Sequence, residues 1–238
     1  SISGTFTAAN SPYVVTGDIY VDHYDSLIIE AGVVFEFFGN YNMDIAGYMY
    51  AVGSTHDSIY FRPYDISNPS RGMWGGISLL HNHPAPMVTM SYFSIAYGGS
   101  NYSNHSALSV TQRNNSDGTY ISHGDIFGST GRGVIVRDNY GNSNGEWGEI
   151  KLTSLDIHHN NWDGLEVYWN EYTNVSFNGL NIYDNDGDGI RVGSHYYPVS
   201  LDITNSTIQN NNYTEVDVSY FNHTGIDLEF HMNNNTIT

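Results

Sequence analysis

Residues 184–189 have the spacing of a calcium-binding loop. They read D-N-D-G-D-G, which places carboxylates at alternate positions around a glycine turn. Oxygen ligands at this spacing suit a hard cation such as Ca²⁺. The position eleven residues after Asp184, where such a loop has its bidentate carboxylate, is His195. The sequence therefore offers Asp184, Asp186 and Asp188 as Ca²⁺ ligands, with an ordinary turn of a repeat as the alternative.

Two histidine pairs are weaker candidates for a transition-metal site. His81 and His83 share one face of an extended segment, but Pro84 follows at once and favours an exposed turn. His158 and His159 point to opposite sides if their backbone is extended. For both pairs, an ordinary turn or strand without a metal ion is the favoured interpretation.

Asparagine sequons suggest where the protein is located. The sequence contains a modest excess of N-x-S/T sites, and Lys151 is its only lysine. Together these features favour an extracellular or cell-surface protein whose loops carry glycans. The predicted glycosylation sites are Asn101, Asn104, Asn114, Asn174, Asn205, Asn212, Asn222 and Asn234.

The composition excludes several classes of protein. Seven basic and 25 acidic side chains give a net charge of −18, which argues against a nucleic-acid partner. Without cysteine there is no disulfide scaffold, thiolate zinc site or cysteine nucleophile. No apolar run approaches the roughly 20 residues of a membrane-spanning helix. At 39% hydrophobic residues, the 238-residue chain can still build a packed core.

The elements that must position these residues are short strands that repeat along the chain. An isoleucine anchor is followed eight and ten residues later by an apolar pair, as Ile157 is by Leu165 and Val167. It is preceded at seven and five residues by another apolar pair, here Ile150 and Leu152. The anchors are Ile95, Ile126, Ile157, Ile182, Ile208 and Ile237.

Three short strands in a unit of about 25 residues describe one coil of a parallel β-helix, because each coil buries its inward face only by stacking on the next. We therefore predict an all-β, single-stranded, right-handed parallel β-helix of about nine coils, without an obvious capping helix. It forms one domain over residues 1–238, with N-terminal coils in 1–85 and regular coils in 86–238. A β-sandwich is the competing fold, but it does not explain why residue types return at fixed offsets.

Polar residues also return at fixed offsets after the anchors. Asparagine stands three residues after three anchors, at Asn160, Asn185 and Asn211, and stacked amides can bond from coil to coil. Nine residues after the same anchors stand Glu166, Arg191 and Asp217, an outward column of alternating charge.

The chain resembles the secreted right-handed parallel β-helix proteins of bacteria and archaea. Residues 14–37, 45–53, 58–61 and 74–77 look like the opening coils of such proteins. The repeats at residues 160–164 and 185–189 look like coils of the pectate-lyase-like and NosD-like members. The resemblance covers nearly the whole chain and implies the fold. It does not imply one function, because the fold hosts lyases, hydrolases, adhesins and structural fibres.

The resemblance implies where an active site would lie if the protein is an enzyme. Polysaccharide lyases of this fold pair Ca²⁺-binding carboxylates with a basic residue, and inverting hydrolases use closely spaced carboxylates. Arg132, Asp163 and Asp188 share one column of the repeat, and Arg191 is close by. These four residues are the candidate catalytic set, although the few basic residues argue against a grip on acidic polysaccharide.

Clustered aromatic residues are a candidate contact surface. Tyr168, Trp169 and Tyr172 follow an outward-turning strand, where they can stack on sugar rings or contact a protein. Aromatic side chains that merely cover the solenoid are the equally weighted alternative.

The sequence favours a non-enzymatic structural role over an enzymatic one. Open β-helix ends invite pairing with another chain, so we expect an extracellular filament or sheath subunit that stacks head to tail with copies of itself. Two alternatives from other classes are a carbohydrate-active enzyme, with or without Ca²⁺, and a carbohydrate-binding or adhesin module with a glycan partner.

Overall fold

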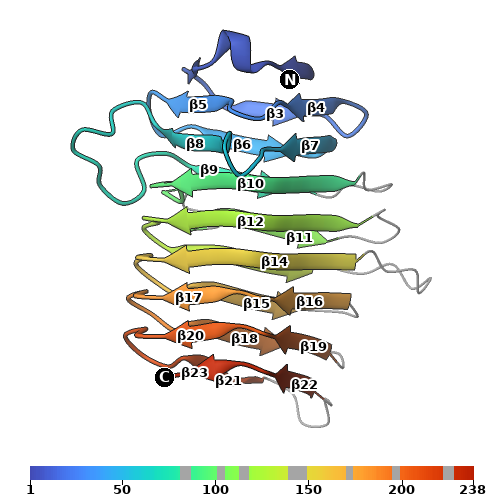
Figure 1. The fold of residues 1–238 in the computed structure, drawn as a ribbon, viewed down its shortest axis with the longest axis vertical. Helices are drawn as coiled ribbons and strands as arrows, with labels where there is room; N and C mark the ends of the chain where they lie inside the picture. Colours follow the sequence, from blue (N-terminus) through green and yellow to red (C-terminus); the bar gives the residue numbers. More distant parts are fainter. Residues whose placement is uncertain are drawn as a thin grey trace.

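The computed structural model describes residues 1–80, 87–100, 105–112, 118–138, 149–169, 174–194, 199–221 and 228–238. Throughout these residues each strand pairs in parallel with its counterpart in the next coil, so the coils stack in a column (Figure 1). This confirms the predicted right-handed parallel β-helix, since the main path of strands in the described part contains nine members. Within the same residues the single helix is a 3₁₀ turn at Ala8–Asn10, so no helix caps the described coils.

The strands form three rows along the column. Row one consists of β1 Gly4–Phe6, β4 Ser26–Ile29, β7 Tyr48–Val52, β10 Val88–Ala96, β12 Thr119–Phe127, β14 Glu149–His158, β16 Asn174–Asn178, β19 Val199–Thr204 and β22 Leu228–Asn233. Row two consists of β2 Tyr13–Val15, β5 Val34–Phe37, β8 Ile59–Pro63, the second halves of β10, β12 and β14, then β17 Asn181–Tyr183, β20 Thr207–Gln209 and β23 Thr236–Ile237. Row three is a separate sheet of β3 Ile19–Val21, β6 Asn42–Ile45, β9 Gly76–Leu79, β11 Ser106–Gln112, β13 Arg132–Asp138, β15 Leu165–Trp169, β18 Ile190–Ser194 and β21 Val216–Phe221.

The anchor isoleucines lie in row two and are register partners in succession. Ile95 pairs with Ile126, Ile126 with Ile157, Ile157 with Ile182, Ile182 with Ile208, and Ile208 with Ile237. The anchors from Ile95 to Ile208 are fully buried, so the repeated isoleucine marks the inward face of the coil.

Large aromatic side chains fill the core of the first coils. Phe35 stacks on Phe61 with ring centroids 5.4 Å apart, and Phe37 stacks on Trp74 at 3.9 Å. Trp74 is completely buried and donates from Nε1 to the carbonyl oxygen of Ala96. No helix in the described part of the chain is long and apolar enough to cross a membrane.

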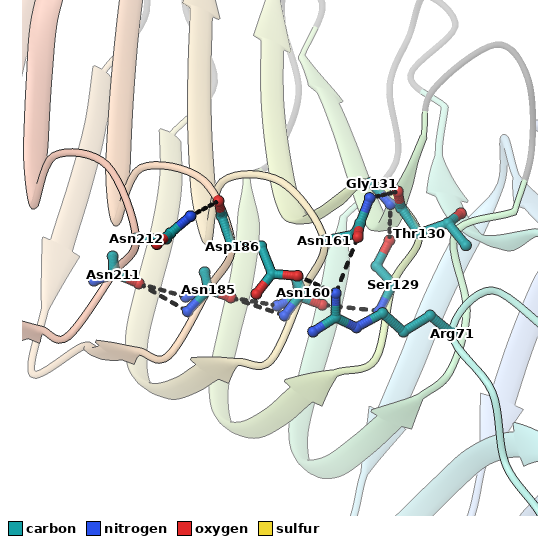
Figure 2. A network of polar contacts seen from close by, with 10 residues as sticks. All are labelled: Arg71, Ser129, Thr130, Gly131, Asn160, Asn161, Asn185, Asp186, Asn211 and Asn212. Atoms are coloured by element: carbon teal, nitrogen blue, oxygen red, sulfur yellow. Dashed lines mark hydrogen bonds and ion pairs between the residues drawn. The ribbon is translucent and has the colours of Figure 1, made fainter.

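A ladder of asparagines joins the coils at the turn between rows two and three (Figure 2); Asn160 and Asn185 are buried and Asn211 is partly buried. Asn160 Nδ2 donates to Asn185 Oδ1 at 2.9 Å, and Asn185 Nδ2 donates to Asn211 Oδ1 at 2.9 Å. The ladder begins at Ser129, whose backbone N–H donates to Asn160 Oδ1, and ends at Glu215, whose carboxylate accepts from Asn211. Stacking of the asparagine column is therefore confirmed.

Glycines make room for this ladder. A Cβ atom on Gly133, Gly164 or Gly189 would lie 2.7–2.8 Å from the Nδ2 atom of the nearest ladder asparagine, closer than real side chains approach. The Asp-Gly pairs at 163–164 and 188–189 thus follow from packing as well as from turn formation.

The loop between β8 and β9, residues 64–75, projects from the side of the column (Figure 1) and contacts the following coils. Its backbone donates from Met73 to the carbonyl of Tyr97 and from Gly72 to that of Gly128. Arg71 then reaches Asn161 and Asp186, which lie 90 and 115 residues away in sequence (Figure 2). We call this segment the β8–β9 loop.

We predict that Asn185→Ala strongly destabilises the protein. Asn185 is 1% exposed, and its loss leaves buried N–H groups of Asn160 and the Asn211 oxygen without their partner. Since each buried unsatisfied group costs about 1–3 kcal/mol, the free energy of unfolding from denaturant titration should fall by about 3 kcal/mol or more. Asn212→Ala is the control, because Asn212 is exposed and follows the ladder residue Asn211 in the equivalent turn of the next coil. This variant should change the free energy of unfolding by less than about 1 kcal/mol. Equal losses in the two variants would contradict a special role for the buried ladder.

Candidate functional site

The structure brings the four predicted catalytic residues into one hollow. Arg132, Asp163, Asp188 and Arg191 line a depression of about 550 Å³ at the turns that lead into β13, β15, β18 and β21. The lining also includes Asn161, Trp162, Asp186, Gly187 and Tyr213. We call this depression the acidic hollow. Its residues come from successive coils, because equal positions of the repeat stack in one line.

Two buried aspartates form the floor of the acidic hollow. Asp163 and Asp188 are 5% and 7% exposed. Asp163 Oδ1 accepts the backbone N–H of Asp188 at 3.0 Å, and Asp188 Oδ1 accepts that of Thr214 at 2.9 Å. Each carboxylate thus binds the next coil through one oxygen, which explains why both residues are buried although they are acidic.

The two aspartates differ in their electrostatic surroundings. Asp163 Oδ2 lies 3.8 Å from Arg132 Nε, so its negative charge is balanced. Burial raises the pKa of Asp188 above the ordinary value, and the neighbouring charge of Asp163 raises it further, against a lowering contribution from its hydrogen bond with Thr214. A carboxyl group with a raised pKa beside a second carboxyl group is an arrangement used for acid–base chemistry.

Arg132 is the central cation of the hollow. It forms an ion pair with Glu166 as well as with Asp163. Burial lowers the pKa of Arg132 to about 10, partly offset by the charge of Asp163, so the guanidinium remains charged at neutral pH. Glu166 and Arg191 are register partners, as are Arg191 and Asp217, so the predicted outward charge column occupies adjacent coils.

Aromatic rings stand at the rim of the hollow. Trp162 is 40% exposed, and the guanidinium carbon of Arg132 lies 4.8 Å from the centroid of its ring. The His105 ring also contacts Trp162, at a centroid distance of 5.3 Å. Tyr213 is 77% exposed and is held by a backbone hydrogen bond to Gly187. Exposed aromatic rings beside charged groups are typical of a site that stacks on sugar rings.

Sequence reasoning missed the aromatic rim and Arg71. Trp162 and Tyr213 occupy turn positions next to the predicted column, so an inspection of the residues flanking Asp163 and Asp188 could have found them. Arg71 could not be found in this way. It pairs with Asn161 and Asp186 only because the β8–β9 loop crosses several coils.

The predicted calcium ligands do not gather around one point. Asp186 pairs with Arg71, Asp188 is directed to Thr214, and Asp184 is exposed on the preceding part of the turn. Among the described residues there is no group of three or more His, Asp or Glu side chains that could hold a metal ion. Asn185 of this turn points inward to the ladder, and Ca²⁺ binding by Asp184, Asp186 and Asp188 stays a prediction.

The other predicted sites are only partly described. Tyr168 lies in β15; the side chain of Trp169 and all of Tyr172 fall outside the described residues, as do His81 and His83. The same holds for Asn101, Asn104, Asn114 and Asn222, and for the side chain of Asn174. Asn205, Asn212 and Asn234 are exposed, and their amide groups donate to Asn178, to Asp186 and to Asn205 respectively.

Comparisons with known proteins give only distant similarities. No protein-family model matches the chain, and the search of curated proteins found no match. Solved structures similar to the chain include the periplasmic alginate epimerase AlgG, with 12% identity, 94% of this chain and 76% of that chain covered, and a TM-score of 0.34. A mutant of AlgG matches at 11% identity over the same shares, with a TM-score of 0.35. The A-module of the Azotobacter vinelandii mannuronan C-5 epimerase AlgE6 matches at 11% identity, with 93% and 55% covered and a TM-score of 0.35. Similarity at this level assigns no activity to the chain.

We predict that Asp188→Asn stabilises the protein at neutral pH. A carboxyl group whose pKa is higher in the folded than in the unfolded chain favours the folded state when protonated and disfavours it when ionised. Asparagine keeps an oxygen that accepts the Thr214 N–H and removes the charge. The free energy of unfolding should therefore exceed that of the wild type at neutral pH.

The pH dependence checks the cause of this effect. The difference between Asp188→Asn and wild type should shrink as the pH falls towards 3.8, the ordinary pKa of the group, because the wild-type carboxyl then becomes neutral as well. Asp184→Asn, an exposed carboxylate in the same turn, should show no comparable gain. A difference that does not vary with pH would contradict the assignment.

Proposed function

We propose that the protein is a carbohydrate-active β-helix that binds a glycan at the acidic hollow and cleaves a glycosidic bond there. One observation carries the proposal: two buried carboxyl groups on adjacent coils, Asp163 and Asp188, lie beside an exposed tryptophan and a buried arginine. This combination supplies both a stacking surface for a sugar ring and groups that can transfer a proton.

The proposed chemistry divides the two carboxyl groups by their surroundings. Asp188, with its raised pKa, donates a proton to the glycosidic oxygen that leaves. Asp163, whose Oδ2 lies beside Arg132, attacks the anomeric carbon, and water later releases the sugar from it. Adjacent coils lie about 4.8 Å apart, close to the separation of the two carboxyl groups in glycosidases that retain configuration. Arg132 and Arg191 add positive charge next to Asp163.

Two variants separate binding from catalysis. Trp162→Ala removes the stacking surface and should weaken glycan binding about tenfold in affinity electrophoresis against a panel of neutral and acidic polysaccharides. Asp188→Asn should keep binding and lower the release of reducing ends at least about 100-fold. Tyr24→Ala, which removes an 80% exposed ring far from the hollow, is the control for both assays.

Each variant can also refute its part of the proposal. Unchanged binding by Trp162→Ala would exclude the hollow as the glycan site. Wild-type rates of reducing-end release in Asp188→Asn would exclude the proton donor. A polymer-degrading site of this kind agrees with the extracellular location predicted from the sequons.

End-to-end association, the function favoured by the sequence, is a second proposal. The strands β21, β22 and β23 each pair with one neighbour among the described strands, and Ile237 is 47% exposed. An edge of this kind can accept a strand from a second copy.

Ile237→Lys tests this association. A lysine on the edge should suppress any concentration-dependent increase of the sedimentation coefficient, because a desolvated charge opposes strand pairing. Tyr48→Lys, at a 45% exposed position on the side of the column, should leave sedimentation unchanged. A wild-type protein that sediments as a monomer at all concentrations would exclude the proposal.

A further inference from the structure

A second and larger depression lies on the outer face of row two, on the other side of the β8–β9 loop from the acidic hollow. Its volume is about 770 Å³. The outward side chains of β8, β10, β12 and β14 form its floor, and Ile66 and Pro69 of the β8–β9 loop form one wall. We call it the aromatic groove. It shares no lining residue with the acidic hollow.

Small side chains on one strand create the groove. Ser94 of β10 is the register partner of Tyr60 in β8 and of Asp125 in β12. Ala96 in the same strand pairs with Phe127. Since larger residues stand on both sides of this serine and alanine, a trough runs along β10. Its volume is within the range of ordinary small-ligand sites, about 300–1,000 Å³.

Aromatic rings line the trough. Tyr60 is 42% exposed, and Tyr97 meets Phe127 edge to face at a centroid distance of 5.2 Å. Phe127 is itself held by the His158 ring, which stacks on it at 5.1 Å and 6°. Fixed aromatic faces of this kind pack against the apolar faces of sugar rings.

Two carboxylates on adjacent coils complete the lining. Asp125 and Asp156 are register partners, and both point outward. Asp125 Oδ1 lies 2.9 Å from His158 Nε2, and Asp156 Oδ1 accepts from Asn181 Nδ2 at 2.8 Å. His158 is the last residue of β14, and His159 after it adopts a left-handed backbone conformation with φ 54°; their Nδ1 atoms lie 2.7 Å apart. The backbone is therefore not extended at His159, so the condition under which the two side chains would point to opposite sides is not met.

The electrostatics of the groove favour a cation. The guanidinium of Arg62, which lines the groove, is paired with Glu36 at 2.8 Å, so it does not balance Asp125 and Asp156. His123 is the other basic side chain of the lining, and its ring stacks on Tyr92. The whole chain carries a charge of −18, which repels polyanions at a distance. Aromatic faces next to carboxylates are the usual surroundings of a bound ammonium group.

We infer that the aromatic groove binds a glycan that carries primary ammonium groups, such as an oligomer of amino sugars. The rings of Tyr60, Tyr97 and Phe127 contact the sugar faces, and the carboxylates of Asp125 and Asp156 accept hydrogen bonds from ammonium groups. This site differs from the acidic hollow in position and in ligand charge, so it goes beyond the proposed function.

Calorimetric titration with three oligosaccharides and one polyamine tests the inference. The full-length protein is titrated at mildly acidic pH with a β-1,4-linked glucosamine tetramer, its N-acetylated counterpart, a galacturonate tetramer and free spermidine. We expect measurable binding of the glucosamine tetramer, binding at least about tenfold weaker for the N-acetylated tetramer, and no binding of the galacturonate tetramer. Spermidine that binds as tightly as the glucosamine tetramer would show that the groove recognises amines and not amino sugars.

Charge variants identify the carboxylates. Asp125→Asn and Asp156→Asn should each weaken the binding of the glucosamine tetramer about tenfold. Asp202→Asn is the matched control, because Asp202 also pairs with a histidine, His231, at 2.9 Å and lies outside the groove. Unchanged affinity in both groove variants, or an equal loss in the control, would overturn the inference.

A filling variant tests the place of binding. Ser94→Tyr should abolish binding by occupying the trough. Thr207→Tyr, in the same outward row of the sheet and outside the groove, should leave both binding and the melting temperature unchanged. Since Trp162→Ala and Asp188→Asn alter only the acidic hollow, they should not affect this titration. Failure of the groove and failure of the hollow can therefore be told apart.

Discussion

Every coil of this protein must pair its backbone with the next coil in a single register, and the buried asparagine ladder fixes that register at the turn. Asn160 and Asn185 each donate to the next coil through both the side-chain amide and the backbone N–H, and Asn211 ends the ladder on Glu215 of its own turn. A slip of one residue would leave these amides buried without partners, as well as turning the isoleucine anchors outward. Glycine recurs next to the ladder in successive coils, at Gly133, Gly164 and Gly189, because a Cβ atom would not fit there.

The same register creates the acidic hollow. Because equal positions stack, Arg132, Asp163 and Asp188 follow one another along the column, and each aspartate bonds to the N–H group of the following coil. A carboxylate oxygen can accept an N–H group of the next coil without a raised pKa. Burial and the neighbouring charge of Asp163 nevertheless raise the pKa of Asp188. A charge kept at the expense of stability in an otherwise consistent fold is a common feature of functional sites.

The β8–β9 loop divides the outer surface into two different chemical environments. On one side Arg71 binds Asn161 and Asp186 at the acidic hollow, where arginines balance the aspartates. On the other side Ile66 and Pro69 border the aromatic groove, where Asp125 is paired with His158, Asp156 with Asn181, and the arginine of the lining, Arg62, with Glu36. Buried Trp74 anchors the end of the loop in the core, so the separation between the two surfaces is part of the fold.

The sequence by itself determined the coil, the anchors, the asparagine ladder and the column of Arg132, Asp163 and Asp188, because each of these depends on a residue type returning at a fixed offset. It also suggested a calcium loop at residues 184–189, which stays a prediction, and the structure adds that Asn185 of this segment is directed inward to the ladder. Only the tertiary structure decided the contacts of Arg71, the geometry of His158 and His159, and the aromatic groove. The physical reason is that these features depend on the path of a long loop, on one left-handed backbone conformation, and on small residues lying between large ones of neighbouring coils. None of these leaves a periodic trace in the chain.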